Sequence, residues 1–223
     1  MLELDKLYNI DCMQGMKEFP DKYFDLAIVD PPYGISVFNQ NRMKDTKQYG
    51  NMLAQRGKYE RKQWDKQPPP AEYFTELMRV SKNQIIWGAN HFISRIPFDS
   101  SCWIVWDKDN GATDFADCEL AWTSFNTAVR RYKYRWNGML QENMKEKEER
   151  IHPTQKPVAL YAWLLGRYAK QGDIILDTHV GSASSLVACY QCGFRFVGFE
   201  IDPDYYEAAN ERLSVEMSQI RLF

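Results

Sequence analysis

The sequence lacks any uninterrupted apolar run that approaches the ~18 residues needed to cross a bilayer. Its N-terminus opens with acids and has no basic-then-apolar order, so neither a secretory signal nor a transit peptide is visible. An excess of charge is also missing, because 28 Lys and Arg stand against 30 Asp and Glu. We therefore expect a cytoplasmic protein without membrane contact, and any binding of nucleic acid must rely on local positive charge.

Cysteines are few, and their odd number of five favours a reducing compartment over a disulfide framework. Cys189 and Cys192 form a C-x-x-C pair, but no second pair stands at a spacing that zinc sites use, and the pair falls in a helical pattern. We therefore predict no metal site. The length of 223 residues is that of a single domain, here residues 1–223.

Short β-branched and aromatic runs alternate with helical patterns along most of the chain. We expect strands at residues 24–29, 84–87, 102–106, 119–125, 174–177 and 196–200. We expect helices at residues 70–81, 158–169, 184–192 and 204–213. This alternation predicts an α/β fold with a doubly wound, mostly parallel sheet. Ligands of such sheets bind at the carboxyl ends of the strands, so the residues that follow each strand are the candidates for function.

Two basic segments interrupt the alternation. Residues 36–66 hold eight basic residues against three acids, and residues 130–150 hold seven against four. We interpret both as insertions that leave the core. Each is either a solvated loop or a surface for nucleic acid.

A glycine and small hydroxyl residues follow the strand at 174–177, where they let the backbone pass close to a ligand at a helix N-terminus. Glu200 comes 23 residues after Asp177, near the ~20-residue offset at which an acid binds a ribose. Only Gly181 is present, so the G-x-G-x-x-G fingerprint is not met. The pattern favours a cofactor with an adenosine and no diphosphate, of which S-adenosylmethionine is the common case. An ordinary βαβ unit with a capped helix is the alternative.

The strand at 24–29 is followed by Asp30, Pro31, Pro32 and Tyr33. The two prolines remove two N–H donors, which leaves carbonyl oxygens and a carboxylate as acceptors beside an aromatic ring. Such a site suits a planar group that carries an NH2. A proline-rich turn would explain the prolines but not the acid and the ring on either side of them.

Residues 30–33 resemble the Asp-Pro-Pro-Tyr signature of DNA amino-methyltransferases, which methylate the exocyclic amine of adenine or cytosine. Residues 152–157, His-Pro-Thr-Gln-Lys-Pro, look like the motif before the cofactor half in the beta subgroup of that family. Residues 177–182 resemble its cofactor loop, and residues 9–12 are similar to the element whose Asp contacts the cofactor adenine. The catalytic half comes first, which is the permuted order of that subgroup and not the order of the protein-glutamine methyltransferases. The resemblance covers essentially the whole chain.

The cofactor loop of the family usually reads Asp-Pro-Phe-x-Gly-Ser-Gly, whereas this chain has Thr178, His179 and Ala183 at three of those places. Residues 106–108 and 116–119 look like variants of small phage-type members. The resemblance therefore implies a bacterial or phage-encoded methyltransferase with a Rossmann-like fold and S-adenosylmethionine as its cofactor.

By resemblance, the aspartate at the head of the motif implies methylation of adenine N6, with cytosine N4 as the alternative. The target base would be rotated out of the duplex, and Tyr33 would stack on it. Hydrogen bonds from the amine to Asp30 and to the Pro31 carbonyl would aim the nitrogen lone pair at the methyl group. Transfer would be direct, so no cysteine is expected to be essential as a nucleophile. A non-catalytic nucleic-acid-binding module with a degenerate cofactor loop is the competing hypothesis.

The implied site residues fall into three groups. Catalysis is assigned to Asp30, Pro31, Pro32 and Tyr33. Cofactor binding is assigned to Asp11, Cys12, Thr154, Lys156, Asp177, His179, Gly181, Ser182 and Glu200. Double-stranded DNA is the expected partner, contacted by Arg42, Lys44, Lys47, Arg56, Lys58, Arg61, Lys62, Arg130, Arg131, Lys133 and Arg135.

Several roles stay open at this point. Lys156 either pairs with the cofactor carboxylate or is a surface charge, and His179 either packs on the cofactor or is an ordinary loop residue. A homodimer and a companion restriction nuclease are further partners that the sequence leaves undecided.

Overall fold

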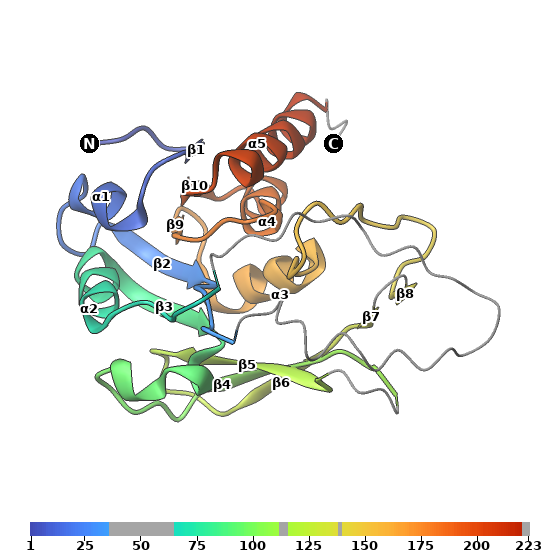
Figure 1. The fold of residues 1–223 in the computed structure, drawn as a ribbon, viewed down its shortest axis with the longest axis horizontal. Coiled ribbons are helices and arrows are strands. Elements are labelled where there is room, and N and C mark those ends of the chain that lie inside the picture. The colour runs from blue at the N-terminus through green and yellow to red at the C-terminus, as the bar shows by residue number, and fades with distance from the viewer. Residues whose placement is uncertain (36–64, 112–115, 138–139, 220–223) are drawn as a thin grey trace.

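The computed structural model describes residues 1–35, 65–111, 116–137 and 140–219, and within these the core is an eight-stranded sheet (Figure 1). The order of its strands is β1-β10-β9-β2-β3-β5-β4-β6. In chain order they are β1 (Lys6–Tyr8), β2 (Phe24–Val29), β3 (Ser81–Trp87), β4 (Trp103–Asp107), β5 (Cys118–Thr123), β6 (Arg130–Lys133), β9 (Ile174–Asp177) and β10 (Arg195–Phe199). Neighbours from β1 to β3 run parallel, and β5 is antiparallel to β3 and to β4. The predicted mostly parallel α/β sheet is confirmed.

The helices cover both faces of the sheet, as a doubly wound fold requires. They are α1 (Cys12–Lys17), α2 (Ala71–Val80), α3 (Val158–Tyr168), α4 (Ser184–Cys192) and α5 (Pro203–Ser218). Figure 1 shows α1 and α2 on one side of the strands and α3, α4 and α5 on the other. Each side has its own apolar core, one built with Phe74 and Leu77 of α2 and the other with Leu164 of α3 and Leu186 of α4.

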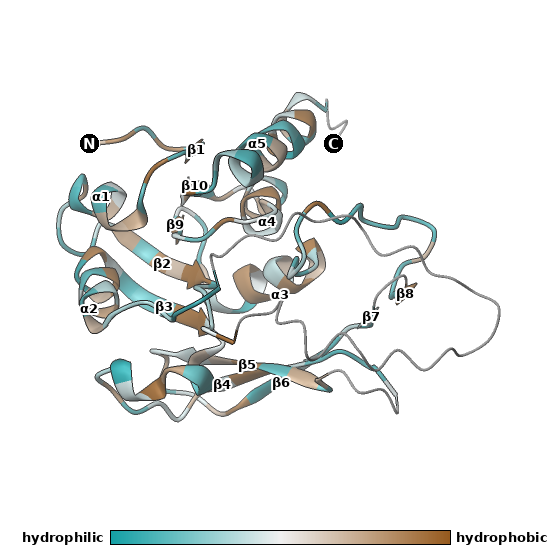
Figure 2. Cartoon of the chain, in the orientation of Figure 1, coloured by the Kyte–Doolittle hydropathy of each residue, from teal (hydrophilic) through white to brown (hydrophobic). Residues whose placement is uncertain are grey.

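Helix α2 shows why these sequences fold as they do. Its buried residues Tyr73, Phe74, Leu77 and Val80 recur at the three- and four-residue spacing of one helix face. Figure 2 shows the hydrophobic residues at the carboxyl ends of β2 and β3 and the more hydrophilic surface of α5. None of the helices in the described part of the chain is both long and apolar enough to cross a membrane.

The second basic segment differs from the expectation that it leaves the core. Its first residues form β6, which pairs parallel with β4 in the register Ile104 with Arg130 and Trp106 with Tyr132. Clustered basic residues favour a loop, but on an edge strand their side chains point to water while the backbone still pairs. Further along, β7 (Trp136–Asn137) and β8 (Leu140–Gln141) form a small antiparallel ribbon.

The parallel strands place one set of acids at a single edge of the sheet. Leu26 of β2 lies beside Ile175 of β9, and β9 and β10 are in register from Ile174 with Arg195 onwards. Strand β1 lies beside β10, with Tyr8 next to Phe199. The carboxyl ends of β1, β10, β9 and β2 therefore lie side by side in that order.

Candidate active site

Four carboxylates follow these four strand ends. Asp11 comes after β1, Glu200 after β10, Asp177 ends β9 and Asp30 comes after β2. Asp30 of the catalytic half and Asp177 of the cofactor half are more than a hundred residues apart in sequence, but they lie at the ends of neighbouring strands. The catalytic and cofactor candidates thus share the edge at which α/β sheets bind ligands.

Asp30 belongs to a compact cluster of charged and phenolic groups. The Tyr33 hydroxyl donates to Asp30 Oδ1 at 2.7 Å, and Lys156 Nζ donates to Asp30 Oδ2 at 2.5 Å. Lys156 Nζ also lies 3.0 Å from Glu119 Oε2 of strand β5. A second ammonium, that of Lys108, forms an ion pair with Glu119 Oε1. Two carboxylates and two ammonium groups therefore balance within one network.

The network is graded in depth. The side chain of Lys156 is only 2% exposed, whereas those of Asp30 and Glu119 keep 17% and 22%. Burial raises the pKa of Asp30, which Lys156 opposes and Glu119 reinforces. Burial also raises the pKa of Glu119, but Lys156 and Lys108 outweigh it and bring that pKa to about 2. The most buried member is thus a cation that two carboxylates hold.

Tyr33 is fixed by its surroundings on several sides. Asp65 Oδ1 accepts hydrogen bonds from the backbone N–H of Tyr33 and of Gly34, at 2.8 and 2.9 Å. The ring of Tyr33 is stacked with that of His91, with 5.1 Å between the ring centroids. Gly88, at the end of β3, lets the ring approach so closely that an added Cβ would lie 2.0 Å from Tyr33 Cε1. The turn after β2 is therefore held in one conformation.

The cofactor loop turns sharply between β9 and α4. Asp177 Oδ1 accepts from the N–H of His179 at 3.0 Å, and its Oδ2 accepts from the Ser185 hydroxyl. Burial raises the pKa of Asp177 to about 7, although both hydrogen bonds oppose this. Gly181 and Ala183 both adopt the left-handed region, at φ +55° and +61°. The family that this chain resembles usually has a second loop glycine at the position of Ala183. The positive φ of Ala183 explains why a glycine is preferred there.

Thr178 and His179, the other departures from the family pattern, link the loop to α2 and α1. Thr178 Oγ1 lies 2.6 Å from the Tyr73 hydroxyl and 2.9 Å from His179 Nδ1. His179 packs edge-on against Tyr73, and its Nε2 lies 4.0 Å from Cys12 Sγ. Burial lowers the pKa of His179 to about 4, so the ring is neutral. These two residues therefore connect the loop to α2 and α1 through one packed cluster.

Glu200 and Asp11 both use their carboxylates on backbone donors. Glu200 accepts from the N–H of Gly181 and of Asp202, each at 2.9 Å. Asp11 caps α1 by accepting from the N–H of Met13 at 2.9 Å. A carboxylate has about four lone-pair sites, so each acid retains acceptor capacity for a ligand.

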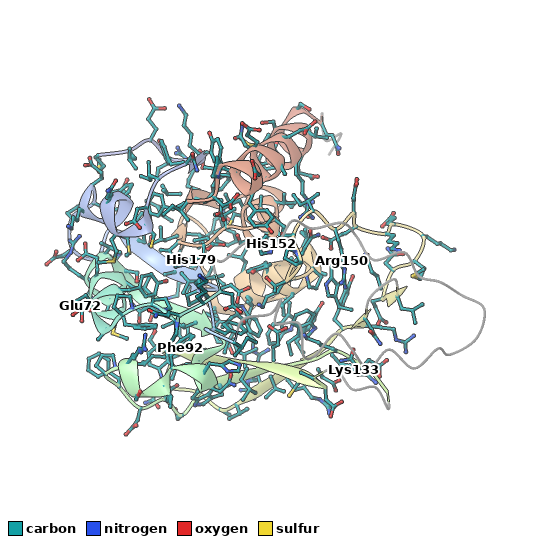
Figure 3. The ribbon with its side chains drawn as sticks, viewed as in Figure 1. Glu72, Phe92, Lys133, Arg150, His152 and His179 are labelled. Atoms are coloured by element: carbon teal, nitrogen blue, oxygen red, sulfur yellow. The ribbon has the colours of Figure 1, made fainter. Side chains whose placement is uncertain are left out.

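The segment before α3 lies between the two halves. The His152 ring packs against Tyr205 of α5, with 4.3 Å between centroids, and it also lies next to Gly181. Thr154 Oγ1 lies 3.1 Å from His152 Nδ1. Figure 3 shows His152 and His179 in the middle of the molecule, whereas Lys133 lies at its rim. Ser182 is buried in the loop beside them.

The predicted DNA-contacting residues divide into two groups. Arg42, Lys44, Lys47, Arg56, Lys58, Arg61 and Lys62 lie outside the described residues. Those of the second segment lie on and after β6, where Arg131 is 71% exposed. Lys133 Nζ lies 2.8 Å from Asp109 Oδ1, and Arg135 lies 2.6 Å from the other oxygen of Asp109. Part of the positive charge of this segment is thus neutralised within the protein.

Sequence reasoning missed Glu119, Lys108 and His91 as site residues. The sequence placed 116–119 and 106–108 in a weak family likeness but offered no reason to join them to Asp30. Strands β4 and β5 pair antiparallel, so the end of β4 lies beside the start of β5, with Trp106 next to Glu119. This pairing brings Lys108 and Glu119 to the site together. Across the described residues, no group of three or more His, Cys, Asp or Glu is placed to hold a metal ion, and none of the five cysteines forms a disulfide.

Comparison with known proteins connects this geometry to a family. A family model described as DNA methylase matches residues 37–211. The type II methyltransferase M2.DpnII of Streptococcus pneumoniae is 25% identical over 94% of this chain and 90% of its own length.

Solved structures agree on the fold. The crystal structure of the M1.HpyAVI–SAM complex has a TM-score of 0.57 at 21% identity, covering 93% of this chain and 98% of that one. The cytosine-N4-specific PvuII DNA methyltransferase has a TM-score of 0.55 at 14% identity, covering 95% and 90%. The family model matches most of this chain. This chain therefore belongs to the DNA methylase family and is a DNA amino-methyltransferase.

Proposed function

We propose that this protein transfers a methyl group from S-adenosylmethionine to the N6 amine of an adenine rotated out of double-stranded DNA. The observation that carries the proposal is the carboxylate of Asp30, held at a strand end beside the Tyr33 ring and next to the cofactor loop. The exocyclic amine of adenine has two protons and a delocalised lone pair. It needs acceptors to orient it more than it needs a base.

Asp30 and the Pro31 carbonyl supply those acceptors. Two hydrogen bonds from the amine favour a pyramidal nitrogen whose lone pair points out of the ring plane. Tyr33 supplies a flat surface for the everted base, and base–aromatic stacking recovers part of the few kcal/mol that eversion costs. Burial raises the pKa of Tyr33, with Asp30 and Glu119 adding to this, so its hydroxyl stays protonated and donates.

The cofactor half fits a nucleoside with a carboxylate and no diphosphate. Ala183 precedes α4 without a polar side chain to cap it, so backbone N–H groups at the helix N-terminus are available to an anion. Glu200 and Asp11 keep acceptor capacity for ribose hydroxyls and the adenine amine. Gly181 leaves room beside His152, because an added Cβ would lie 3.5 Å from that ring. S-adenosylmethionine supplies an electrophilic methyl group when it is bound there.

The DNA contacts are assigned to the basic segments 36–66 and 130–150 of a single domain. Phosphate contacts need exposed cations, which Arg131 and Lys133 provide on the edge strand β6. Asp109 orients Lys133 and Arg135 side by side, and phosphates would compete with it for both.

The test is to identify the modified base. Unmethylated duplex DNA is incubated with the protein and S-adenosylmethionine that carries a labelled methyl group, and it is then digested to nucleosides for mass spectrometry. Labelled N6-methyl-2′-deoxyadenosine is expected. Labelled N4-methyl-2′-deoxycytidine would make cytosine the substrate in place of adenine, and a protein that does not bind the cofactor at all would be a non-catalytic binding module.

A variant separates the role of Asp30 from that of the fold. Asp30→Ala should abolish methyl transfer while the thermal unfolding curve stays cooperative and S-adenosylmethionine still binds. Wild-type turnover by this variant would remove Asp30 from the amine.

A further inference from the structure

We propose that Lys156 and Glu119 are positioning residues for Asp30: Lys156 fixes one carboxylate oxygen, and Glu119 holds Lys156 in place. This inference rests on the proposed role of Asp30 and adds two residues to it. It assigns Lys156 to the substrate side of the site, in contrast to a contact with the carboxylate of the cofactor.

The geometry supports this assignment directly. Lys156 Nζ lies 2.5 Å from Asp30 Oδ2, 3.0 Å from Glu119 Oε2 and 3.1 Å from the Tyr33 hydroxyl. These three contacts use the three donors of an ammonium group. The aromatic rings of Tyr33 and Trp87 lie 5.6 and 5.4 Å from the same nitrogen. Lys156 therefore has no donor left for a further anion unless it gives up one of these partners.

Glu119 acts through Lys156 and Lys108, with which it forms ion pairs. It sits on β5, opposite Trp106, and reaches the site from the antiparallel side of the sheet. One of its oxygens pairs with Lys108, and the other accepts from Lys156 and lies 3.3 Å from the Tyr33 hydroxyl, whose proton points to Asp30. Without this oxygen, Lys156 would lose its second anchor, whereas a glutamine would keep a carbonyl oxygen in the same place and remove only the charge.

The charges lead to opposite expectations for the two residues. The Lys156 ammonium favours the ionised form of Asp30, while the Glu119 carboxylate opposes it. Removing the ammonium should therefore raise the pKa of Asp30, and removing the Glu119 charge should lower it. The other groups that face Asp30 are Tyr33 on its own turn, Tyr73 on α2, Tyr161 on α3 and Asp177 on β9. All of these stay in place in the variants below.

The experiment compares Lys156→Met, Glu119→Gln and the double variant with the wild type. Single-turnover methyl transfer to duplex DNA is measured from about pH 5 to pH 9 at saturating S-adenosylmethionine, and the acidic limb reports the ionisation of the catalytic carboxylate. Asp30→Asn is the control and should lose that limb. Binding of S-adenosylmethionine is measured in parallel by calorimetry.

The acidic limb should move up by about one to three pH units in Lys156→Met and down in Glu119→Gln. It should return towards the wild-type position in the double variant, which removes one buried charge of each sign and so also serves if Lys156→Met does not fold. The dissociation constant of the cofactor should change by less than about threefold, because neither residue is expected to touch it.

Two results would overturn the inference. One is cofactor affinity weakened more than about tenfold in Lys156→Met with an unmoved limb, which would return Lys156 to the cofactor. The other is an acidic limb at the same pH in the double variant as in Lys156→Met. That result would show that Glu119 does not influence the ionisation of Asp30. Failure of the proposed function looks different: the wild type would label no base, or Asp30→Ala would turn over normally.

Discussion

Gly88 offers the sharpest test of how the fold holds the substrate-side ring. It directly follows β3, in the left-handed region at φ +67°, and an added Cβ would lie 2.0 to 2.4 Å from three atoms of the Tyr33 ring. In Gly88→Ala the backbone alone should cost about 1–2 kcal/mol. The ring must also move, which breaks its 2.7 Å hydrogen bond to Asp30 and leaves a buried acceptor, at about 1–3 kcal/mol more.

Catalysis should suffer with stability. A displaced Tyr33 would lose the proposed stacking with an everted base, worth about 1–3 kcal/mol, so kcat/KM for DNA should fall by about 5- to 150-fold. Binding of S-adenosylmethionine should be unaltered. The assays are denaturant unfolding, steady-state methylation of duplex DNA and calorimetry with the cofactor.

The matched control is Gly193→Ala. Gly193 has a similar φ of +75°, but an added Cβ meets no described atom within 4 Å, so only the backbone cost of about 1–2 kcal/mol should appear. In a Tyr33→Ala background, Gly88→Ala should likewise cost no more than that. Equal effects of Gly88→Ala and Gly193→Ala on kcat/KM would contradict a clash with the Tyr33 ring, as would a full Gly88→Ala penalty in the absence of that ring.

Three further predictions concern the cofactor loop and the DNA surface. Glu200→Ala should weaken S-adenosylmethionine binding in calorimetry, and an unaltered dissociation constant would remove Glu200 from the ribose. Replacing Arg131 and Lys133 by Ala should flatten the plot of log affinity for DNA against log salt by up to ~0.9 per lost phosphate contact, and an identical slope would move the DNA surface elsewhere. His179 is neutral when folded and is protonated when unfolded below its usual pKa of 6.5, so unfolding takes up a proton between pH 6.5 and about 4. The free energy of unfolding should therefore fall as pH falls through that range, and in His179→Asn this fall should be smaller by up to about 3 kcal/mol in denaturant titrations.

The fold was predictable wherever a compact apolar segment has clear ends. Strand β9 is a short, almost wholly buried apolar run and α4 ends at Gly193, and both occupy the residues expected from the sequence. The short β1 and α1 were missed, since three and six residues are too few to show a period. Strand β6 was mistaken for a loop because its charges hid a backbone that pairs with β4.

The site was predictable in part for a similar reason. Asp30, Asp177 and Glu200 each follow a strand, and a parallel sheet brings such residues to one edge. Glu119 comes near the start of an antiparallel strand, where the rule about strand ends does not apply. Nothing in the spacing of residues 30, 119 and 156 indicates that they meet.

The chemical groups of the site are already visible along the chain: an acid and a ring around two prolines, a small-residue loop after a strand, and the order of the two halves. These are local properties, because a few neighbouring residues fix backbone direction, available donors and acceptors, and the period of burial. The contacts of Lys156 with Asp30 and Glu119 arise only in the folded protein. The same is true of the hydrogen-bonded chain from His179 through Thr178 to Tyr73. Ion pairs and buried hydrogen bonds depend on a few ångströms between segments distant in sequence, and packing of the sheet and helices sets those distances.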